Sequence, residues 1–277
     1  MQIRNDMQTL AEAGERWQKV AASRMPGRPK ARDFIDLMFD DFIELKGDRQ
    51  YGDDGAVVAG IAYLDNMPVT VMGQHKGRNF AESMDAHFGM PHPEGYRKSL
   101  RLMREAEKFR RPVVCIIDTP GAYPGIDAEA RGQGAAIAAN LLELSHLKTP
   151  VIGIIIGEGG SGGALALAMG DHLIMLENTY FSVISPEGCA SILWKDTSLA
   201  PRAAESLKPT AADLKKMGIA DSIIKEPQNL TNENMGRVVR ELRRQVYRVA
   251  HKLMLLTPEE LIERRWKRYS SMAGQGA

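Results

Sequence analysis

The chain has 277 residues, of which 44% are apolar and 26% charged, with a formal net charge of +1. This composition is typical of a soluble globular protein with one large domain or two small ones, and it offers no basic field that would favour nucleic acid. We expect neither a signal peptide nor a membrane span, because no apolar run approaches ~20 residues. Cys115 and Cys189 form no CxxC pair, which excludes a zinc ribbon in this chain and favours a reducing, cytoplasmic setting.

The N-terminal third of the sequence predicts two helices and a β-hairpin. Residues 9–23 and 33–46 carry apolar side chains at helical spacing, with a Pro/Gly-rich break between them. Residues 56–64 and 68–73 are predicted strands, joined through Asp65-Asn66, a pair typical of tight turns.

The next segment is polar, and it is followed by a predicted helix. Residues 74–78 carry Lys76 and Arg78, and they either lie in an exposed loop or contact an anionic group. Residues 80–93 are rich in small and polar side chains and are expected to be a mobile loop. Residues 93–109 predict a helix whose cations Arg97 and Lys98 are either solvent-exposed or ligand contacts.

The central stretch predicts a β-α-β unit. Residues 113–118 and 151–156 are short, almost wholly apolar runs without polar alternation, which is typical of parallel strands buried on both faces. Apolar residues at helical spacing lie between them, and such a crossover is almost always right-handed. The sequence therefore predicts an α/β fold with a parallel sheet.

Glycines follow the second of these strands, at the start of a helix predicted over residues 158–168. Side-chain-free residues here expose backbone N–H groups where the positive end of the helix dipole lies, which suits an oxyanion. The alternative is tight packing of the helix on the sheet, because Ala164, Ala166 and Ala168 are also small. The glycines alone leave both interpretations open.

The C-terminal part predicts short strands and capped helices. Strands are expected at residues 172–177 and 180–184, and helices at 208–218 and 235–256. Ser185 and Thr210 are predicted N-caps, and residues 257–260 read as a capping box for a final helix.

Several distinctive motifs lie between residues 28 and 269: GDR (47–49), FGMPHPEGYRKSLRLM (88–103), DTPGAYPG (118–125), RGQ (131–133), GEGGSGGALA (157–166), SVISPEGCASILWKD (182–196) and TPEELIERRWKRY (257–269). Together they resemble one family, the alpha subunits of bacterial acetyl-CoA carboxylase carboxyltransferase. The resemblance implies a crotonase-like (ClpP/crotonase) β-β-α superhelix with helical extensions at both ends. We expect an N-terminal arm (1–30) and a carboxyltransferase domain (31–277), with its core at about 47–226 and C-terminal helices at about 231–270.

The same resemblance implies a function and partners. The family transfers the carboxyl group of carboxybiotin to acetyl-CoA, giving malonyl-CoA for fatty acid biosynthesis. The expected partners are a zinc-ribbon beta subunit in an α2β2 assembly, the biotin carboxyl carrier protein and biotin carboxylase. This chain has no Met-Lys-Met biotinylation signature and no P-loop, so biotin would visit on its carrier and ATP would be used by another component. Zinc is expected only in the beta subunit, and no metal in this chain.

Carboxyl transfer implies negative charge on a thioester enolate and on the ureido oxygen of biotin, which fixed N–H donors would stabilise. The donors implied by the resemblance are backbone groups of Gly162, Gly163 and Ala164, with Gly121 and Ala122 nearby. Substrate contacts are expected at Tyr123, Pro124, Gly159, Gly160, Ser161, Lys76, Arg97 and Lys98. We expect Gly163→Ala to be tolerated better than Gly163→Val. The chain departs from the family at Gln74-His75, at Asp127, and in the acidic and neutral residues 80–87.

Three other functions remain open from the sequence. Ser161 between glycines suggests a serine hydrolase on this fold, if His75, His146 or His172 serves as its base. A crotonase-type hydratase or isomerase would need an acid, for which Glu158 or Glu187 could serve. A non-catalytic binding module is the third alternative.

Overall fold

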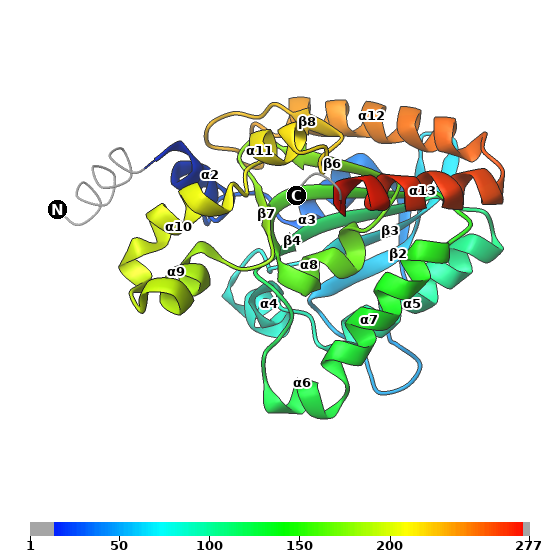
Figure 1. The fold of residues 1–277 in the computed structure, drawn as a ribbon. Helices are drawn as coiled ribbons and strands as arrows, with labels where there is room; N and C mark the ends of the chain where they lie inside the picture. The colour runs from blue at the N-terminus through cyan, green and yellow to red at the C-terminus, as the bar shows by residue number, and fades with distance from the viewer. Residues whose placement is uncertain (1–13, 274–277) are drawn as a thin grey trace.

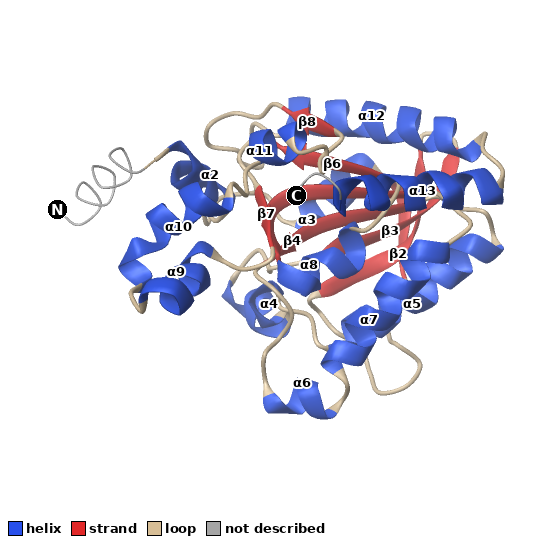
Figure 2. Ribbon diagram, viewed as in Figure 1, coloured by secondary structure: helices blue, strands red, loops and turns tan. Residues whose placement is uncertain are grey.

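The computed structural model describes residues 14–273, which form one mixed eight-stranded sheet covered by helices (Figures 1 and 2). The strand order is β1-β2-β3-β4-β5-β6-β8, and β7 pairs with the end of β5. The β1–β2 and β2–β3 pairs are antiparallel and the others parallel. The strands are β1 (Asp40–Glu44), β2 (Val57–Leu64), β3 (Met67–Gln74), β4 (Val113–Thr119), β5 (Val151–Gly160), β6 (His172–Leu176), β7 (Tyr180–Ser182) and β8 (Ser222–Ile224).

Helices pack on both faces of the sheet. They are α2 (Glu15–Ser23), α3 (Ala31–Met38), α4 (Phe80–Asp85), α5 (Pro93–Lys108), α6 (Ile126–Ala130), α7 (Gln133–His146), α8 (Ser161–Ala168), α9 (Pro186–Trp194), α10 (Ala200–Leu207), α11 (Ala211–Lys216), α12 (Gly236–Met254) and α13 (Pro258–Ala273), with short 3-10 turns η1 (His87–Gly89) and η2 (Thr197–Leu199). Helices α3 and α12 cover one face, and α5, α8 and α11 cover the other. Every residue of β4 and β5 is buried, which confirms the prediction from their apolar runs.

The predicted hairpin and helix caps are confirmed. Leu64 pairs with Met67 across the Asp65-Asn66 turn. The side chains of Ser185 and Thr210 accept hydrogen bonds from the backbone N–H groups of Gly188 and Asp213. The box at residues 257–260 forms through reciprocal bonds between Thr257 and Glu260.

The helix predicted over residues 33–46 is wrong in its second half. Helix α3 ends at Met38, and residues 40–44 form strand β1 at the edge of the sheet. The helical spacing that begins at Phe34 continues through Phe42 and Leu45, but pairing with β2 outweighs it. Tertiary pairing of this kind often overrides a local pattern.

The loop predicted over residues 80–93 is also wrong, because helix α4 and the turn η1 occupy most of it. Asn79 caps α4 by accepting a hydrogen bond from Glu82 N at 3.0 Å. An Asn followed three residues later by Glu was the signal in the sequence for this helix start.

The N-terminal helix α2 lies against α10, at one side of the molecule (Figure 1). Its Arg16 forms ion pairs with Glu205 and Asp213, at 2.7 and 2.8 Å. The helix predicted over residues 9–23 is confirmed from Glu15 onward, while its first residues lie outside the described part. The predicted division into arm and core stays a prediction. No helix among residues 14–273 combines the length and apolar character needed to cross a membrane.

Candidate active site

Two glycine-bearing turns meet at the carboxyl ends of β4 and β5, where parallel strands commonly place a ligand. A Cβ atom on Gly160 would lie 2.0 Å from the carbonyl oxygen of Pro120. A Cβ atom on Gly163 would lie 2.5 Å from the backbone nitrogen of Ala122. Glycine is therefore required at both positions. That Gly163→Ala is tolerated better than Gly163→Val stays a prediction, but even the single methyl group of alanine has no space here.

The turn after β4 leaves one backbone donor unused. The N–H of Gly121 donates to Thr119 Oγ1 at 3.1 Å, and the N–H of Tyr123 donates to Pro91 O at 3.0 Å. The N–H of Ala122, between them, has no acceptor in the described part of the chain. Gly121 thus shapes the turn through its unusual φ of +151°, but it offers no free N–H group to a ligand.

The second set of donors comes from the start of α8. The first N–H groups of a helix have no partner within it, and the dipole adds positive charge there. Ser161, the first residue, has φ +54°, a left-handed conformation that costs energy for a non-glycine residue. Gly162 and Gly163 follow it, and Gly163 packs directly against the Ala122 turn. The two turns together can bind an anion.

Two buried polar side chains support Gly163, and sequence reasoning did not identify either as a site residue. Gln74 at the end of β3 donates from Nε2 to Gly163 O at 2.7 Å. The hydroxyl of Tyr96, on α5, would lie 2.8 Å from a Gly163 Cβ, and it has no hydrogen-bond partner in the described structure. Burial raises the pKa of Tyr96 above its usual range, so this hydroxyl keeps its proton. Its orphaned polar atom suits a site that is completed by a ligand or water.

Gln133 of the RGQ motif holds the Tyr123 turn in place. Its Nε2 donates to Pro91 O at 2.9 Å and to Tyr123 O at 3.0 Å. The Tyr123 ring stacks on His92, and Pro124 beside it is exposed. The motif thus ties the β4 turn to the segment before α5.

Lys76 belongs to an ion-pair network at the edge of the sheet that carries the site. Its ammonium binds Asp118 Oδ1 at 2.8 Å and also Glu158. Glu158 further binds Arg24, the residue after helix α2, at 2.6 Å and accepts a hydrogen bond from the Tyr180 hydroxyl at 2.9 Å. Burial alone would raise the pKa of Glu158, but Lys76 and Arg24 outweigh it and hold the pKa at about 2. Lys76 therefore joins β3, β4 and β5 at the edge that carries the site.

The other two predicted cations are also paired with carboxylates of the chain. Arg97 binds Asp48 at 2.7 Å and Glu94 at 2.9 Å. Lys98 is 1% exposed and binds Asp53 at 2.5 Å. Contacts from Lys76, Arg97 or Lys98 to a substrate stay predictions, and each would require displacing an existing partner.

An apolar cavity of about 370 Å³ opens beside the start of α8. Ser161 and Gly162 form part of its wall, and Phe181 of β7 forms another part. Ser182 and further apolar side chains complete the lining: Leu165, Val183, Leu207, Leu214, Met217 and Ile219. Gly159 packs against the same Phe181, since a Cβ on it would lie 2.8 Å from Phe181 Cδ2. An apolar pocket with a few convergent polar groups is typical of a ligand site.

The side chains needed by the alternative reactions are engaged elsewhere. None of the histidines in the described residues bonds to Ser161: His75 pairs with Glu82, His146 with Ser145 and His172 with Ser222. Glu187 pairs with Arg24 at 2.5 Å, and Glu158 lies in the buried network above. The geometry therefore gives no support to a serine nucleophile or to a free acid at the site.

A family model described as acetyl co-enzyme A carboxylase carboxyltransferase-like matches residues 2–273. The acetyl-coenzyme A carboxylase carboxyl transferase subunit alpha of Listeria innocua is 52% identical over 256 residues, covering 92% of this chain and 80% of that protein. The subunit of the same name from Clostridium perfringens is 51% identical over 263 residues, covering 95% and 97%.

Solved structures share the fold at low sequence identity. Transcarboxylase 12S superposes with a TM-score of 0.64 at 18% identity, covering 82% of this chain and 43% of the larger one. A Pseudomonas malonate decarboxylase hetero-tetramer in complex with coenzyme A superposes at 0.63 with 17% identity, covering 82% and 91%. These neighbours are crotonase-fold enzymes, so the predicted fold class is confirmed.

Proposed function

Because the chain belongs to the acetyl-coenzyme A carboxylase carboxyltransferase-like family, we propose that it is the alpha subunit of an acetyl-CoA carboxylase carboxyltransferase. In this role it transfers a carboxyl group from carboxybiotin to acetyl-CoA and forms malonyl-CoA for fatty acid synthesis. The observation that carries the proposal is the meeting of the Ala122 turn with the start of α8, beside an apolar cavity.

The backbone of the two turns would stabilise the negative charge that develops during transfer. The free N–H of Ala122 and the first N–H groups of α8, which include those of Gly162, Gly163 and Ala164, are fixed before any ligand binds. Loss of one such donor typically costs about 3 kcal/mol of barrier. Gln74 and Thr119 hold the peptides of Gly163 and Gly121 in these positions.

The cavity beside Ser161 and Gly162 fits the visiting biotin group. Its lining is mostly apolar, and the donors at the start of α8 lie at one part of its wall. When bound, carboxybiotin would supply the carboxyl group and a ureido group basic enough to take the methyl proton of the thioester. The chain therefore needs no side-chain base, in agreement with the engaged state of Glu158 and Glu187.

A carboxyltransferase subunit of this family acts in a complex with other subunits. The specific partners that we propose are a zinc-ribbon beta subunit in an α2β2 assembly, the biotin carboxyl carrier protein and biotin carboxylase, which would use ATP. The pairing of Lys76, Arg97 and Lys98 supports this division of labour, because each of these cations already has a carboxylate partner in place of the phosphates of coenzyme A. Two unpaired cysteines fit the reducing cytoplasm as the location.

The test is malonyl-CoA formation by this chain alone, by a candidate beta subunit alone and by both together, with carboxylated carrier protein supplied. We expect activity only in the mixture. Activity of this chain alone, for example enoyl-CoA hydration, would contradict the proposal. Absence of malonyl-CoA from a purified, stable complex would contradict it as well.

A further inference from the structure

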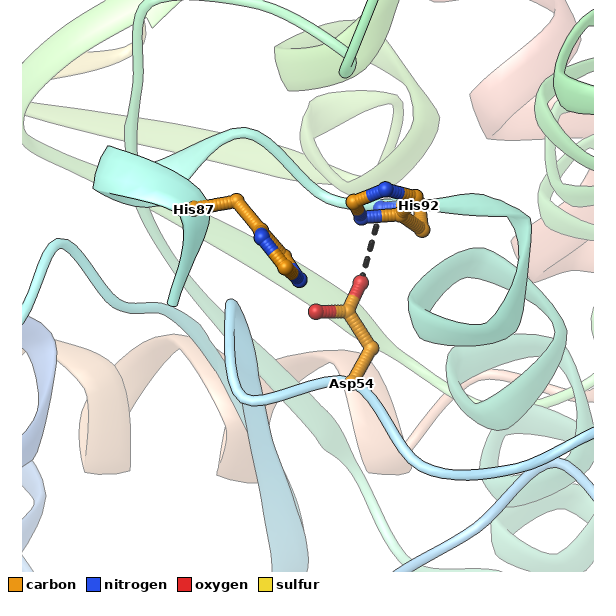
Figure 3. Close-up of side chains that lie close together, drawn as sticks. All are labelled: Asp54, His87 and His92. Atoms are coloured by element: carbon orange, nitrogen blue, oxygen red, sulfur yellow. Dashed lines mark hydrogen bonds between the residues drawn. The ribbon is translucent and has the colours of Figure 1, made fainter. Parts of the chain in front are cut away.

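Three side chains with metal-binding atoms come together beside the Tyr123 turn, and the proposed reaction uses none of them. Asp54 precedes β2, His87 begins η1, and His92 caps α5. One ligand atom from each lies within 4.8 Å of the others. In Figure 3 the carboxylate of Asp54 points toward the space between the two imidazole rings.

Apart from His92 Nε2, which lies 3.6 Å from Asp127 Oδ2, the polar side-chain atoms of this cluster have no side-chain hydrogen-bond partner among the described residues. His92 Nδ1 is buried without a hydrogen bond, and the His87 ring makes only ring contacts with His92 and Tyr123 among the described residues. Asp54 is 3% exposed, and its carboxylate accepts only from backbone N–H groups, those of Ala56 and His92. A buried polar group left unpaired lowers the stability of the fold by ~1–3 kcal/mol. A ligand that binds these atoms would remove that cost.

The charges around the cluster suit a cation. Asp54 is buried, and no lysine or arginine side chain of the described residues donates a hydrogen bond to its carboxylate. The ammonium of Lys98 is close, but it is bound to Asp53 and to the Asp54 carbonyl rather than to the Asp54 carboxylate.

We propose that Asp54, His87 and His92 bind one divalent transition-metal ion of the Zn²⁺ class, with water completing its coordination. Two imidazoles and one carboxylate are ordinary ligands of zinc, which binds each at ~2.0–2.2 Å. Tetrahedral ligand atoms at that radius lie about 3.3 Å apart, so modest side-chain rotations would bring this set around an ion. Each carboxylate oxygen of Asp54 retains a second lone pair beyond its backbone bond.

A second carboxylate lies where it would support this ion. His92 Nε2 faces Asp127 Oδ2 at 3.6 Å, while His92 Nδ1 is the free, buried nitrogen. In many metal sites a histidine ligand donates its other N–H to a carboxylate, which fixes the ring. The half-buried His87 and the exposed Asp127 leave the cluster a path to solvent.

The role of the ion would be structural. His87, Phe88 and Gly89 have φ values of +47°, +54° and +81°, and each non-glycine residue in this region costs ~1 kcal/mol or more. A metal bound to His87 would stabilise this strained turn. Gly89 O accepts from Thr119 Oγ1 at 2.6 Å, and the His92 ring stacks on Tyr123 at 4.1 Å. The ion would therefore stabilise the turn that carries the free backbone N–H of Ala122.

The test uses the full chain without an affinity tag, freed of metal with a chelator and titrated with Co²⁺. We expect one Co²⁺ per chain with a visible d–d absorption band, and displacement of that band by Zn²⁺. Absence of a stoichiometric ion on the folded wild-type chain would overturn the proposal, whatever the variants do. The readout is binding, so it is independent of the proposed carboxyl transfer.

Variants then assign the ligands. His87→Asn removes an imidazole but suits positive φ, and we expect it to weaken Co²⁺ binding more than ~100-fold. Asp127→Asn should weaken binding by about 10-fold, the smaller effect of a group that acts through a ligand. His251→Asn, at an exposed histidine of α12, is the matched control and should bind as the wild type does. Equal affinity of the wild type and the folded His87→Asn variant would refute the assignment.

Discussion

Adding one methyl group at Gly163 should separate catalysis from folding at the proposed site. The Cβ of Gly163→Ala would lie 2.5 Å from Ala122 N, 2.7 Å from Gly121 C and 2.8 Å from Tyr96 Oη. Two of these atoms belong to backbone, so the Ala122 turn must move away from α8. Overpacking of this kind costs ~1–3 kcal/mol of stability. Misplacing one N–H donor costs ~100- to 1,000-fold in kcat.

The measurement compares malonyl-CoA formation and thermal unfolding for two variants in complex with the beta subunit. Gly134→Ala is the control, because a Cβ there meets nothing within 4 Å and the residue lies in helix α7. We expect Gly163→Ala to lose at least ~100-fold in kcat while remaining folded, and Gly134→Ala to behave as the wild type does. A folded, assembled Gly163→Ala enzyme with wild-type kcat would refute the assignment of the donors.

Two further predictions concern the buried ion pairs. A glutamate carboxyl ordinarily has a pKa of 4.5, but the pKa of Glu158 is held at about 2. Its ionised form therefore adds about 3 kcal/mol to the free energy of unfolding. This contribution is complete above pH 4.5 and is lost as the pH falls toward 2. Urea unfolding between pH 7 and pH 3 should show a steeper loss of stability for the wild type than for Glu158→Gln, and equal slopes would contradict this. Arg265 is 1% exposed and binds Asp171 at 2.7 Å, so Arg265→Met leaves a buried charge unpaired. We expect it to lower the free energy of unfolding by ~3–5 kcal/mol in urea titrations, and a loss below 1 kcal/mol would show that the pair is dispensable.

Much of the site was predictable because its signals are local. The apolar runs of β4 and β5 specify strands that are buried on both faces, and glycines at their ends specify turns without side chains. Caps such as Ser185 and Thr210 act on backbone groups within three residues. The motifs around the two turns carry the family resemblance, which the comparisons confirm.

The tertiary structure decided how distant segments meet, which local patterns cannot encode. The run 40–44 is a strand because β2 offers an open edge, although its spacing is helical. Lys76 is a half-buried, ion-paired cation because β4 and β5 bring Asp118 and Glu158 to it. Gly163 excludes even a methyl group because the Ala122 turn packs against it. Asp54 and His92 lie far apart in sequence, and only the packing of η1 and α5 beside β2 places them with His87 around one point. The sequence alone determined the buried central strands, the caps and the glycine turns. Burial and charge pairing across the sheet, which depend on long-range contacts, determined what each polar side chain can do.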